Sequence, residues 1–385
     1  MIHKIINLGY HPLADSFLNK NQIKKEKKKK LECYLNSESK RLFIKSNFNS
    51  SFRYNNVDYS YTSSNSNMSK KHWDNFFEKC NKFFKISKKK ILEIGSNDGY
   101  LLKKFQKFNT ILGVDASKIM ASKARTKGIP TLNMSFNFKE SFKIKKKYGQ
   151  FDFIIANHVL NHSDNEFNFL KGAKNLMFQN SILILEVPYW GFQIKNNYFD
   201  QIYHEHRSYY TIEYIIYLSK KLDLKITNFE IVNYHGKSIR IFLSKKKSEF
   251  KEKKMKKILQ NEKKLKLYNL QTYRNFMKKI TTRKKNLRLK INKIIKKNKI
   301  IAVGASAKGN TFLNFVGLTN KEIYAVTDNS YYKINKYTPG SNIKIRDDYI
   351  FKKFKKVYAI ILSWNFSKSL KKKILKYNKR IRFIK

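Results

Sequence analysis

The sequence predicts an α/β protein in which a small, irregular N-terminal lobe precedes two sheet-and-helix domains. Apolar runs typical of strands alternate with stretches of helical spacing from residue 90 to 189, and again from residue 299 to 364. Each region opens with a strand, a glycine-containing turn and a helix, at 90–108 and at 299–318. Such alternation implies a mainly parallel sheet with helices on both faces.

The predicted domains are 1–70, 71–245 and 246–385, and a length of 385 residues allows this number. Residues 1–70 are polar, rich in Ser, Asn and Tyr, and show no clear period. In the middle domain we expect helices at 73–84, 99–108 and 166–177 and strands at 90–96, 110–117, 151–160 and 181–189. The Lys-rich stretch 246–298 has apolar residues at helical spacing, which predicts one or two amphipathic connecting helices. The last domain is expected to hold strands at 299–306, 322–330 and 359–364 and a helix at 307–318.

The chain carries a formal net charge of +56, from 83 Lys and Arg against 27 Asp and Glu. Nucleic acid or an anionic surface is one interpretation of such a charge. However, Arg, which specific nucleic-acid readers favour for bidentate contacts, accounts for only 11 of the basic residues. The basic residues are also spread along the whole chain, so we attribute the charge to compositional drift and expect no specific nucleic-acid partner. A general attraction for anionic substrates remains.

The sequence also bears on the compartment. It holds no run of about 18 apolar residues, so we expect no membrane span. The N-terminus lacks the apolar stretch of a signal peptide. Only Cys33 and Cys80 are present, without a Cys-x-x-Cys pair, which favours neither a disulfide framework nor a cysteine-rich zinc site. We therefore expect a cytoplasmic protein without a bound metal.

The segment 91–102, ILEIGSNDGYLL, has the pattern of a nucleoside-binding turn between a strand and a helix. Its glycines allow a ligand to approach the backbone, and Asp115 ends the next strand, where a carboxylate accepts hydrogen bonds from ribose hydroxyls. The G-x-G-x-x-G run of dinucleotide enzymes is absent, and the polar Asn97–Asp98 pair fits a methyltransferase better. A generic turn with incidental glycines is the alternative. The candidate cofactor residues here are Glu93, Gly95, Asn97, Asp98, Gly99 and Asp115.

A dense group of titratable residues lies at 199–210, FDQIYHEHRSYY. Acid–base sites gather such groups, and His162 follows the strand predicted at 151–160. The spacing of His204 and His206 is compatible with a metal, but no further ligand set and no H-E-x-x-H helix are evident. A structural role for these histidines is the alternative. The candidates are Tyr203, His204, Glu205, His206 and His162.

The second glycine-rich turn, GASAKGNT at 304–311, places Lys308 and hydroxyl groups at the start of a helix, which suits a phosphate. Its spacing is not that of a Walker A loop. A second Rossmann-like half kept for packing is the alternative. Lys308 and Asn310 are the candidate substrate-binding residues in this domain.

Together these segments resemble the sugar C-methyltransferase family, which acts on thymidine-diphosphate-linked 4-keto deoxysugars. The resemblance covers nearly the whole chain and is most specific in EVPYWGFQIKNNYFDQIYHEHRSYYT at 186–211. Further matching segments are LGYHPLADSFL (8–18), DYSYTSSNSNMSKKHW (58–73), EIGSNDGYLL (93–102), NYHGKSIRIFL (233–243), VGASAKGNTFLNFVGL (303–318), DNSYYKINKYTPGSNIKI (328–345) and SWN (363–365).

The resemblance implies a Rossmann-like methyltransferase domain with S-adenosylmethionine as cofactor, and a second Rossmann-like domain for a nucleotide-sugar. It adds Asn157, which ends the segment FDFIIAN, to the cofactor residues. It implies that His206 is the base that removes a proton from a carbon beside a ketone, while Tyr203, Glu205 and His162 hold the sugar. Tyr59 or Tyr61 would close over the site, and Lys308 would hold the nucleotide diphosphate.

One departure from the family concerns zinc. The family carries an N-terminal zinc domain with two Cys-x-x-Cys pairs. The first pair would precede His3, and the second would fall at 35–42, where Asn36 and Ser39 stand. Zinc is therefore not expected. The lobe would then hold its shape by packing, or be loose, or be covered by a partner.

Three rival functions remain open at this point. The chain could methylate oxygen or nitrogen of a small molecule, in which case His206 would be dispensable. It could be a degenerate homologue that binds ligand without turnover. A nucleic-acid methyltransferase is the third rival, and affinity that falls steeply with salt would favour it.

Overall fold

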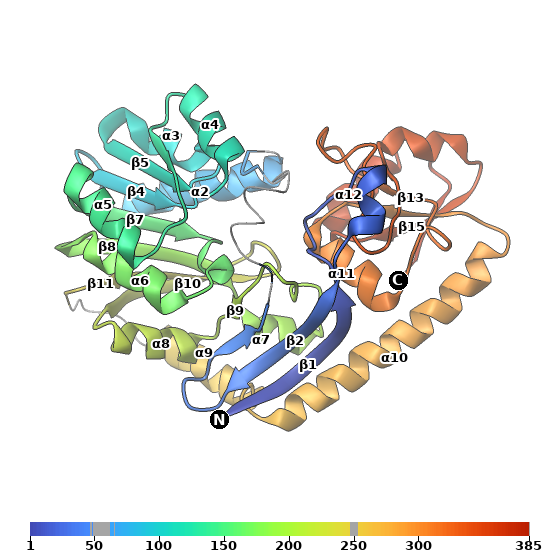
Figure 1. Ribbon diagram of the computed structural model, residues 1–385, viewed down its shortest axis with the longest axis horizontal. Coiled ribbons are helices and arrows are strands. Elements are labelled where there is room, and N and C mark those ends of the chain that lie inside the picture. The colour runs from blue at the N-terminus through green and yellow to red at the C-terminus, as the bar shows by residue number, and fades with distance from the viewer. Residues whose placement is uncertain (47, 49–61, 65, 247–252, 385) are drawn as a thin grey trace.

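The computed structural model describes residues 1–46, 48, 62–64, 66–246 and 253–384. It contains three sheets, of seven, five and four strands. In Figure 1 the seven-stranded sheet and its helices occupy the left half and the five-stranded sheet the right half, and the N-terminal strands lie below and between them. The long helix α10 (Leu270–Ile295) runs along the lower edge toward the five-stranded sheet.

The seven-stranded sheet is doubly wound. Its order is β10-β11-β8-β7-β4-β5-β6, with parallel pairing from β8 to β6 and antiparallel pairing of β11 with both of its neighbours. The strands are β4 (Lys90–Ile94), β5 (Thr110–Asp115), β6 (Thr131–Asn133), β7 (Phe151–Asn157), β8 (Met177–Pro188), β10 (Lys225–Val232) and β11 (Ser238–Ser244). The accompanying helices are α2 (Asn67–Phe84), α3 (Tyr100–Phe105), α4 (Lys118–Thr126), α5 (Phe138–Tyr148), α6 (Glu166–Asn175), α7 (Trp190–Asn196) and α8 (Ile212–Lys221). These elements confirm the predicted α/β class.

The C-terminal sheet is entirely parallel, in the order β14-β13-β12-β15-β16. Counted along the chain from β12, this is the order 3-2-1-4-5 of a Rossmann-type sheet, whose ligands bind at the carboxyl ends of the strands. The strands are β12 (Ile300–Val303), β13 (Ala325–Thr327), β14 (Ile345–Arg346), β15 (Val357–Ile361) and β16 (Ile381–Phe383). The helices are α11 (Ala307–Val316) and α12 (Ser367–Ile374).

Polar side chains start the helices of both domains. Ser117 accepts a hydrogen bond from the backbone N–H of Met120 at the start of α4, and Ser306 accepts one from Gly309 at the start of α11. Such N-caps satisfy backbone donors that have no partner inside the helix. They also set where each helix begins relative to the strand before it, and thus fix the turns that face a ligand.

The N-terminal lobe contains an antiparallel sheet, so the prediction of an irregular lobe was wrong for the residues that form its strands. Its strands are β1 (Ile2–His11), β2 (Lys29–Asn36), β3 (Leu42–Ile44) and β9 (Ser208–Tyr209), all paired antiparallel. In β2 the buried residues Leu31, Cys33 and Leu35 alternate with less buried polar ones. The period does not extend through the lobe, because the adjacent Ile5 and Ile6 of β1 are both buried and β3 has only three residues, so the sequence showed no clear alternation.

At the zinc positions of the family, the β2–β3 turn is closed by hydrogen bonds of its own. The side-chain Oδ1 of Asn36 accepts from the backbone N–H groups of Glu38 and Ser39, at 3.0 and 3.1 Å. Within the described residues, no group of three or more His, Cys, Asp and Glu side chains is arranged to hold a metal ion. An Asx-type turn thus shapes this hairpin.

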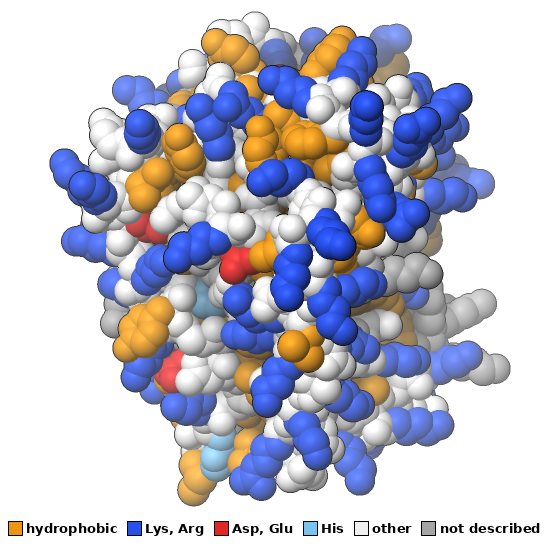
Figure 2. All heavy atoms as spheres, turned by 90° about the vertical axis from the view of Figure 1, so that its right-hand side faces the viewer, with side chains coloured by type: hydrophobic (Ala, Val, Ile, Leu, Met, Phe, Trp, Pro, Cys, Tyr) orange, Lys and Arg blue, Asp and Glu red, His pale blue; other side chains and the backbone are white. Residues whose placement is uncertain are grey.

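The Lys-rich stretch forms two helices, α9 (Lys253–Lys264) and α10, as its spacing predicted. Lys and Arg side chains cover much of the face in Figure 2, spread between apolar and neutral groups rather than gathered in one patch. In the described parts of the chain, no helix is both long and apolar enough to cross a bilayer.

Candidate functional site

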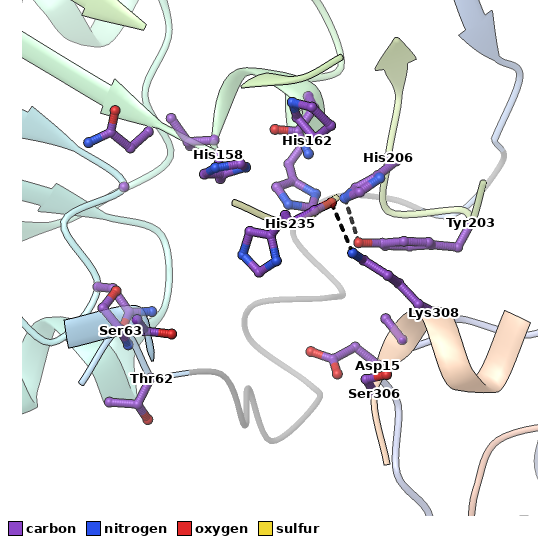
Figure 3. A pocket seen from close by; sticks show the side chains of 18 of the residues that line it. Asp15, Thr62, Ser63, His158, His162, Tyr203, His206, His235, Ser306 and Lys308 are labelled. Atoms are coloured by element: carbon purple, nitrogen blue, oxygen red, sulfur yellow. Dashed lines mark hydrogen bonds between the residues drawn. The ribbon is translucent and has the colours of Figure 1, made fainter. Parts of the chain in front are cut away.

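A cavity of about 880 Å³ lies between the seven-stranded and the five-stranded sheets. The turns that follow β4, β5 and β7 line one side, and those that follow β12, β13 and β15 line the other. Both parallel sheets thus direct the carboxyl ends of their strands into one space, which is where α/β folds bind ligands. The close-up in Figure 3 shows histidines from the first domain facing Lys308 and Ser306 of the second.

The turn after β4 is built for close approach of a ligand. Gly95 has φ of +75°, and a Cβ there would lie 2.9 Å from the Cβ of Val159. The backbone N–H of Asn97 donates to Oδ2 of Asp115 at 2.8 Å, and that of Ser117 donates to Oδ1 at 2.8 Å. The carboxylate is therefore fixed at the end of β5, where a ribose would meet it.

Buried polar atoms in the same wall fit a nucleoside cofactor. Oε2 of Glu93 and both amide atoms of Asn157 are buried without a hydrogen-bond partner among the described residues. Burial raises the pKa of Glu93 well above its usual value, and the charges of Asp115 and Asp98 add to this. Because unpaired buried polar atoms cost free energy, donors and acceptors of a ligand account for them. The hydroxyl and amino groups of S-adenosylmethionine would supply both hydrogen-bond donors and hydrogen-bond acceptors.

Two predicted cofactor residues do not line the cavity. Asp98 is fully buried, and its carboxylate is paired with Lys127 at 2.7 Å and accepts from the hydroxyl of Ser64. Gly99 has φ of +73° at the start of α3, and a Cβ there would lie 3.0 Å from Ile129. Asp98 and Gly99 therefore support the turn without lining the cavity. Glu93, Gly95, Asn97, Asp115 and Asn157 line the cavity.

Tyr203 and His206 form a hydrogen-bonded pair in the cavity wall (Figure 3). Nδ1 of His206 lies 2.8 Å from the backbone oxygen of Gln201, and Nε2 lies 2.5 Å from the hydroxyl oxygen of Tyr203. Because a carbonyl oxygen only accepts, Nδ1 carries the hydrogen and the phenol donates to Nε2. This tautomer leaves Nε2 as the nitrogen that can take up a proton.

His162 lies beside this pair, with its ring centroid 4.8 Å from that of His206. Its Nδ1 donates to the backbone oxygen of Glu205 at 2.7 Å, which orients the ring. The amide of Asn161, a residue that the sequence did not single out, lines the cavity, and neither of its polar atoms has a partner among the described residues. An imidazole and an amide thus stand next to the candidate base.

Three other predicted site residues lie outside the cavity lining and connect elements instead. Oε1 of Glu205 accepts from the backbone N–H of Asp15 at 2.9 Å. Nε2 of His204 lies 3.1 Å from the backbone oxygen of His11, and burial lowers the pKa of His204 to about 4. The amide of Asn310 donates to the backbone oxygen of Ala14 at 2.7 Å.

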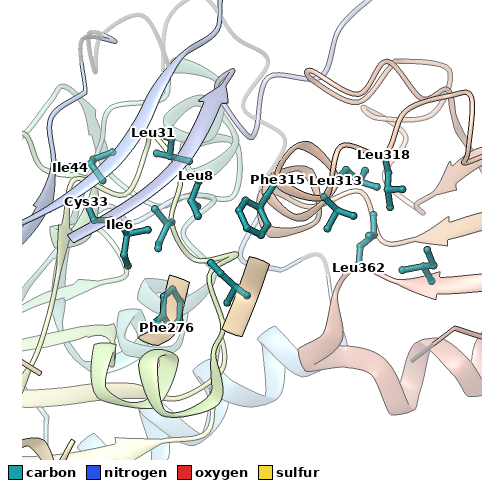
Figure 4. Close-up of a cluster of buried hydrophobic side chains, with 14 of the residues drawn as sticks. Ile6, Leu8, Leu31, Cys33, Ile44, Phe276, Leu313, Phe315, Leu318 and Leu362 are labelled. Carbon is teal, nitrogen blue, oxygen red and sulfur yellow. The ribbon is translucent and has the colours of Figure 1, made fainter. Parts of the chain in front are cut away.

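The same three contacts tie the segment 203–206 and α11 to the lobe, and a shared apolar core supports them. In Figure 4, Ile6 and Leu8 of β1 and Cys33 of β2 point toward Phe276 of α10 and Phe315 of α11. Asp15 of the lobe also lines the cavity, so the lobe forms part of the wall of the site. Tyr59 and Tyr61, predicted to cover the site, lie outside the described residues.

His158 and His235 are cavity residues that the sequence analysis missed. Both have positive φ, 54° and 49°, and their rings meet edge to face at 4.8 Å. Nε2 of His158 lies 2.9 Å from Oε1 of Glu186. His158 directly follows β7, and His235 lies in the segment before β11. These positions next to strand ends could have indicated site residues, but neither histidine belongs to a motif of its own.

Glu186 anchors this wall from inside the protein. It is completely buried and paired with His158, with His72 at 2.9 Å, and with the Arg240 guanidinium at 2.7 and 2.9 Å. Burial alone would raise the pKa of this carboxyl, but Arg240 and the two imidazoles hold it well below its usual value. An ionised Glu186 accepts from Nε2–H of His158 and so fixes that ring at the cavity.

Lys308 faces the first domain from the start of α11. Its Nζ donates to the backbone oxygen of His235 at 3.2 Å. Burial lowers the pKa of this amine to about 8, and the nearby Asp200 opposes the shift. A cation at a helix N-terminus that faces a cavity suits an anionic group of a ligand.

Two family models match the chain. One for a methyltransferase domain covers residues 69–228, and one for a C-methyltransferase C-terminal domain covers residues 233–384. Among curated proteins, the C-methyltransferase NovU of Streptomyces niveus is 26% identical over 280 residues, which span 72% of this chain and 67% of that protein.

Solved structures with weak overall similarity include magnesium protoporphyrin IX methyltransferase from Synechocystis PCC 6803 with bound SAH. It is 14% identical, has a TM-score of 0.37, and the match covers 46% of this chain and 83% of that one. The PH0226 protein from Pyrococcus horikoshii is 17% identical at a TM-score of 0.38, with 52% of this chain and all of that chain covered.

Proposed function

Since this chain is an S-adenosylmethionine-dependent C-methyltransferase, we propose that it methylates a carbon beside the ketone of a nucleotide-diphosphate-linked keto deoxysugar. One observation carries the proposal. A single cavity brings together the nucleoside-type turn at Gly95 and Asp115, the Tyr203–His206 pair, and Lys308 from the second domain. These are the groups that a methyl donor, an acidic carbon and an anionic carrier require.

The Tyr203–His206 pair is the proposed base. A hydrogen on a carbon next to a ketone is weakly acidic, so its removal needs a positioned acceptor and stabilisation of the enolate. Nε2 of His206 can receive the proton, directly or from the phenol of Tyr203, whose oxygen then takes the proton of the substrate carbon. The bond from Nδ1 to the Gln201 carbonyl favours the imidazolium that results.

The amide of Asn161 is the donor that we assign to the ketone oxygen as negative charge develops on it. Nδ1 of His162 donates to the Glu205 carbonyl, so its Nε2 is left to accept from a hydroxyl of the sugar. Glu93, Asn157 and Asp115 would hold the cofactor, which would supply an electrophilic methyl group. The main contribution of the chain is then alignment, because holding two reacting centres in register in a closed site lowers the barrier substantially. Glu205 and His204 act through the backbone that they fix rather than by contact with the sugar.

The direct test is incubation of the purified protein with S-adenosylmethionine and a panel of nucleotide-linked keto sugars, with product mass as the readout. A gain of one methyl group in place of hydrogen is expected on a ketone. The matched control is the same nucleotide sugar with its ketone reduced to an alcohol, which has no acidic carbon. Equal methylation of ketone and alcohol would instead support transfer to oxygen.

Asp115→Ala is expected to weaken binding of S-adenosylmethionine by about 1–3 kcal/mol, because ribose hydroxyls and two backbone N–H groups lose their acceptor. Calorimetry with the cofactor alone measures this. Asp152→Ala is the matched control, because Asp152 accepts from the backbone of Lys90 at the opposite end of the strands. If the affinity of Asp115→Ala for S-adenosylmethionine is unchanged, the cofactor does not bind at this position.

Affinity for a nucleoside diphosphate is expected to decline as pH rises through about 8. Burial lowers the pKa of Lys308 to about 8, so its amine is charged below that pH and neutral above it. Lys308→Met should bind the diphosphate more weakly and without this pH dependence, whereas Lys321→Met, at an exposed site, should behave as wild type. A wild-type affinity that stays constant on both sides of pH 8 contradicts a contact between Lys308 and the diphosphate.

A further inference from the structure

His158 offers the cavity a hydrogen-bond acceptor whose tautomer is fixed from behind. Its Nε2 lies 2.9 Å from Oε1 of Glu186, the fully buried carboxylate that Arg240 keeps ionised. Because an ionised carboxylate only accepts, Nε2 carries the hydrogen and Nδ1 keeps a lone pair. No described residue donates to this lone pair, and Nδ1 is not enclosed by protein atoms. Since His158 lines the cavity, a donor on a bound ligand can reach Nδ1.

The backbone at His158 is strained in the position that aims this ring. Its φ is +54°, in the left-handed region that residues with a Cβ rarely adopt. Its backbone N–H donates to the carbonyl oxygen of Glu186 at 2.7 Å, so one residue fixes both the backbone and the ring of His158. Strained residues of this kind gather at functional sites. The orientation of the imidazole is therefore a feature of the site rather than of the packing alone.

The position of His158 favours the sugar over the cofactor as its partner. Its ring meets that of His235 at 4.8 Å, and the backbone oxygen of His235 accepts from Lys308, the residue assigned to the diphosphate. Burial lowers the pKa of His158, and the charge of Lys308 acts in the same direction. In Figure 3 the two imidazoles face Lys308, whereas Ser63, which donates to Asn97 of the cofactor turn, lies apart from them.

We propose that His158 is a specificity-determining residue whose Nδ1 accepts a hydrogen bond from a hydroxyl of the sugar. The inference rests on the proposed function, because it adds to the recognition of that substrate. In this tautomer Nδ1 accepts and cannot donate, so a sugar without that hydroxyl leaves the acceptor unpaired in a closed site. The ketone and the acidic carbon are recognised separately, at Asn161 and His206. His158 thus selects for a hydroxyl that takes no part in the chemistry.

Methylation of matched substrates tests the proposal: a thymidine-diphosphate-linked 4-keto-6-deoxy sugar, and counterparts that each lack one further ring hydroxyl. In wild type, removal of one particular hydroxyl is expected to lower kcat/KM about three- to tenfold, the effect of one hydrogen bond. His158→Phe keeps a ring without an acceptor, so its preference for that hydroxyl should fall toward one. His158→Asn tolerates a positive φ and offers an amide oxygen, so it should keep part of the preference.

His72→Phe is the matched control, because Nε2 of His72 also lies 2.9 Å from Oε1 of Glu186 but His72 does not line the cavity. Its ring stacks on that of Tyr234 at 3.8 Å, a contact that Phe retains. This variant should keep the wild-type preference even if its rate falls. A structural role of His158 would lower the rates with all substrates by one factor and leave the preference intact, which would overturn the inference.

Two further outcomes separate this inference from its alternatives. Calorimetry in which His158→Phe loses affinity for S-adenosylhomocysteine but keeps the hydroxyl preference places the ring at the cofactor and overturns the inference. Methylation of keto sugars by wild type at the same kcat/KM whichever hydroxyl is missing also overturns it, while the proposed function is upheld. Failure of wild type to methylate any nucleotide-linked keto sugar, with S-adenosylhomocysteine still bound, overturns both.

Discussion

His206→Ala is expected to leave cofactor binding intact and to reduce turnover by about 10²- to 10⁴-fold, the usual contribution of a positioned base. The imidazole accepts from the hydroxyl of Tyr203 at 2.5 Å and donates to the Gln201 carbonyl at 2.8 Å. Without it, the phenol has no acceptor for its proton. Single-turnover kinetics with saturating S-adenosylmethionine measure the loss, and calorimetry with the cofactor shows that the fold of the site is kept.

Hydrogen exchange separates this mechanism from its rivals. In deuterated water, wild type should exchange the hydrogen on the carbon beside the ketone, because deprotonation precedes methyl transfer. His206→Ala should lose the exchange, and the reduced alcohol substrate should show none with either protein. Tyr203→Phe tests the relay: it removes the phenol but keeps the ring, so residual exchange would mean that His206 reaches the carbon directly. Full activity of His206→Ala with no exchange in wild type would falsify the carbon-methylation mechanism.

Arg240→Met is expected to destabilise the protein by about 3–5 kcal/mol, the cost of leaving a buried charge without its partner. Arg240 is 2% exposed and pairs with the fully buried Glu186 and, at 2.5 Å, with Glu230. The change in the free energy of unfolding follows from the denaturant midpoint. Because Glu186 also orients His158, the variant should lose activity under conditions where it remains folded.

Lys79→Met is the matched control, since Lys79 pairs with the same Glu230 at 2.9 Å but is 62% exposed. Exposed ion pairs contribute little, so its effect should stay below about 1 kcal/mol. The double variant Glu186→Gln, Arg240→Met should recover part of the lost stability, because no uncompensated carboxylate is then buried. Equal small effects of Arg240→Met and Lys79→Met would contradict the view that this ion pair anchors the cavity wall.

The sequence by itself determined those parts of the protein whose chemistry is local. The turn from β4 to α3 and the carboxylate at Asp115 are specified by residues within one strand–turn–helix–strand unit, and the strand pattern of both sheets follows from apolar runs that are buried on two faces. The α/β class and the two amphipathic connecting helices were predicted for the same reason. The lobe was not, because its first strand interrupts the alternation, with the adjacent Ile5 and Ile6 both buried, and β3 has only three residues.

Only the tertiary structure decided which neighbours in the sequence face the cavity. Tyr203, His204, Glu205 and His206 are consecutive, yet Tyr203 and His206 line the cavity while His204 and Glu205 turn toward the lobe. The backbone of His11 and Asp15, which are far from this segment in the sequence, holds His204 and Glu205 on the side of the lobe. His158 and Asn161 likewise line the cavity because two sheets meet there. A period or motif reports local backbone geometry, whereas the side of a loop that meets a ligand depends on what packs behind it.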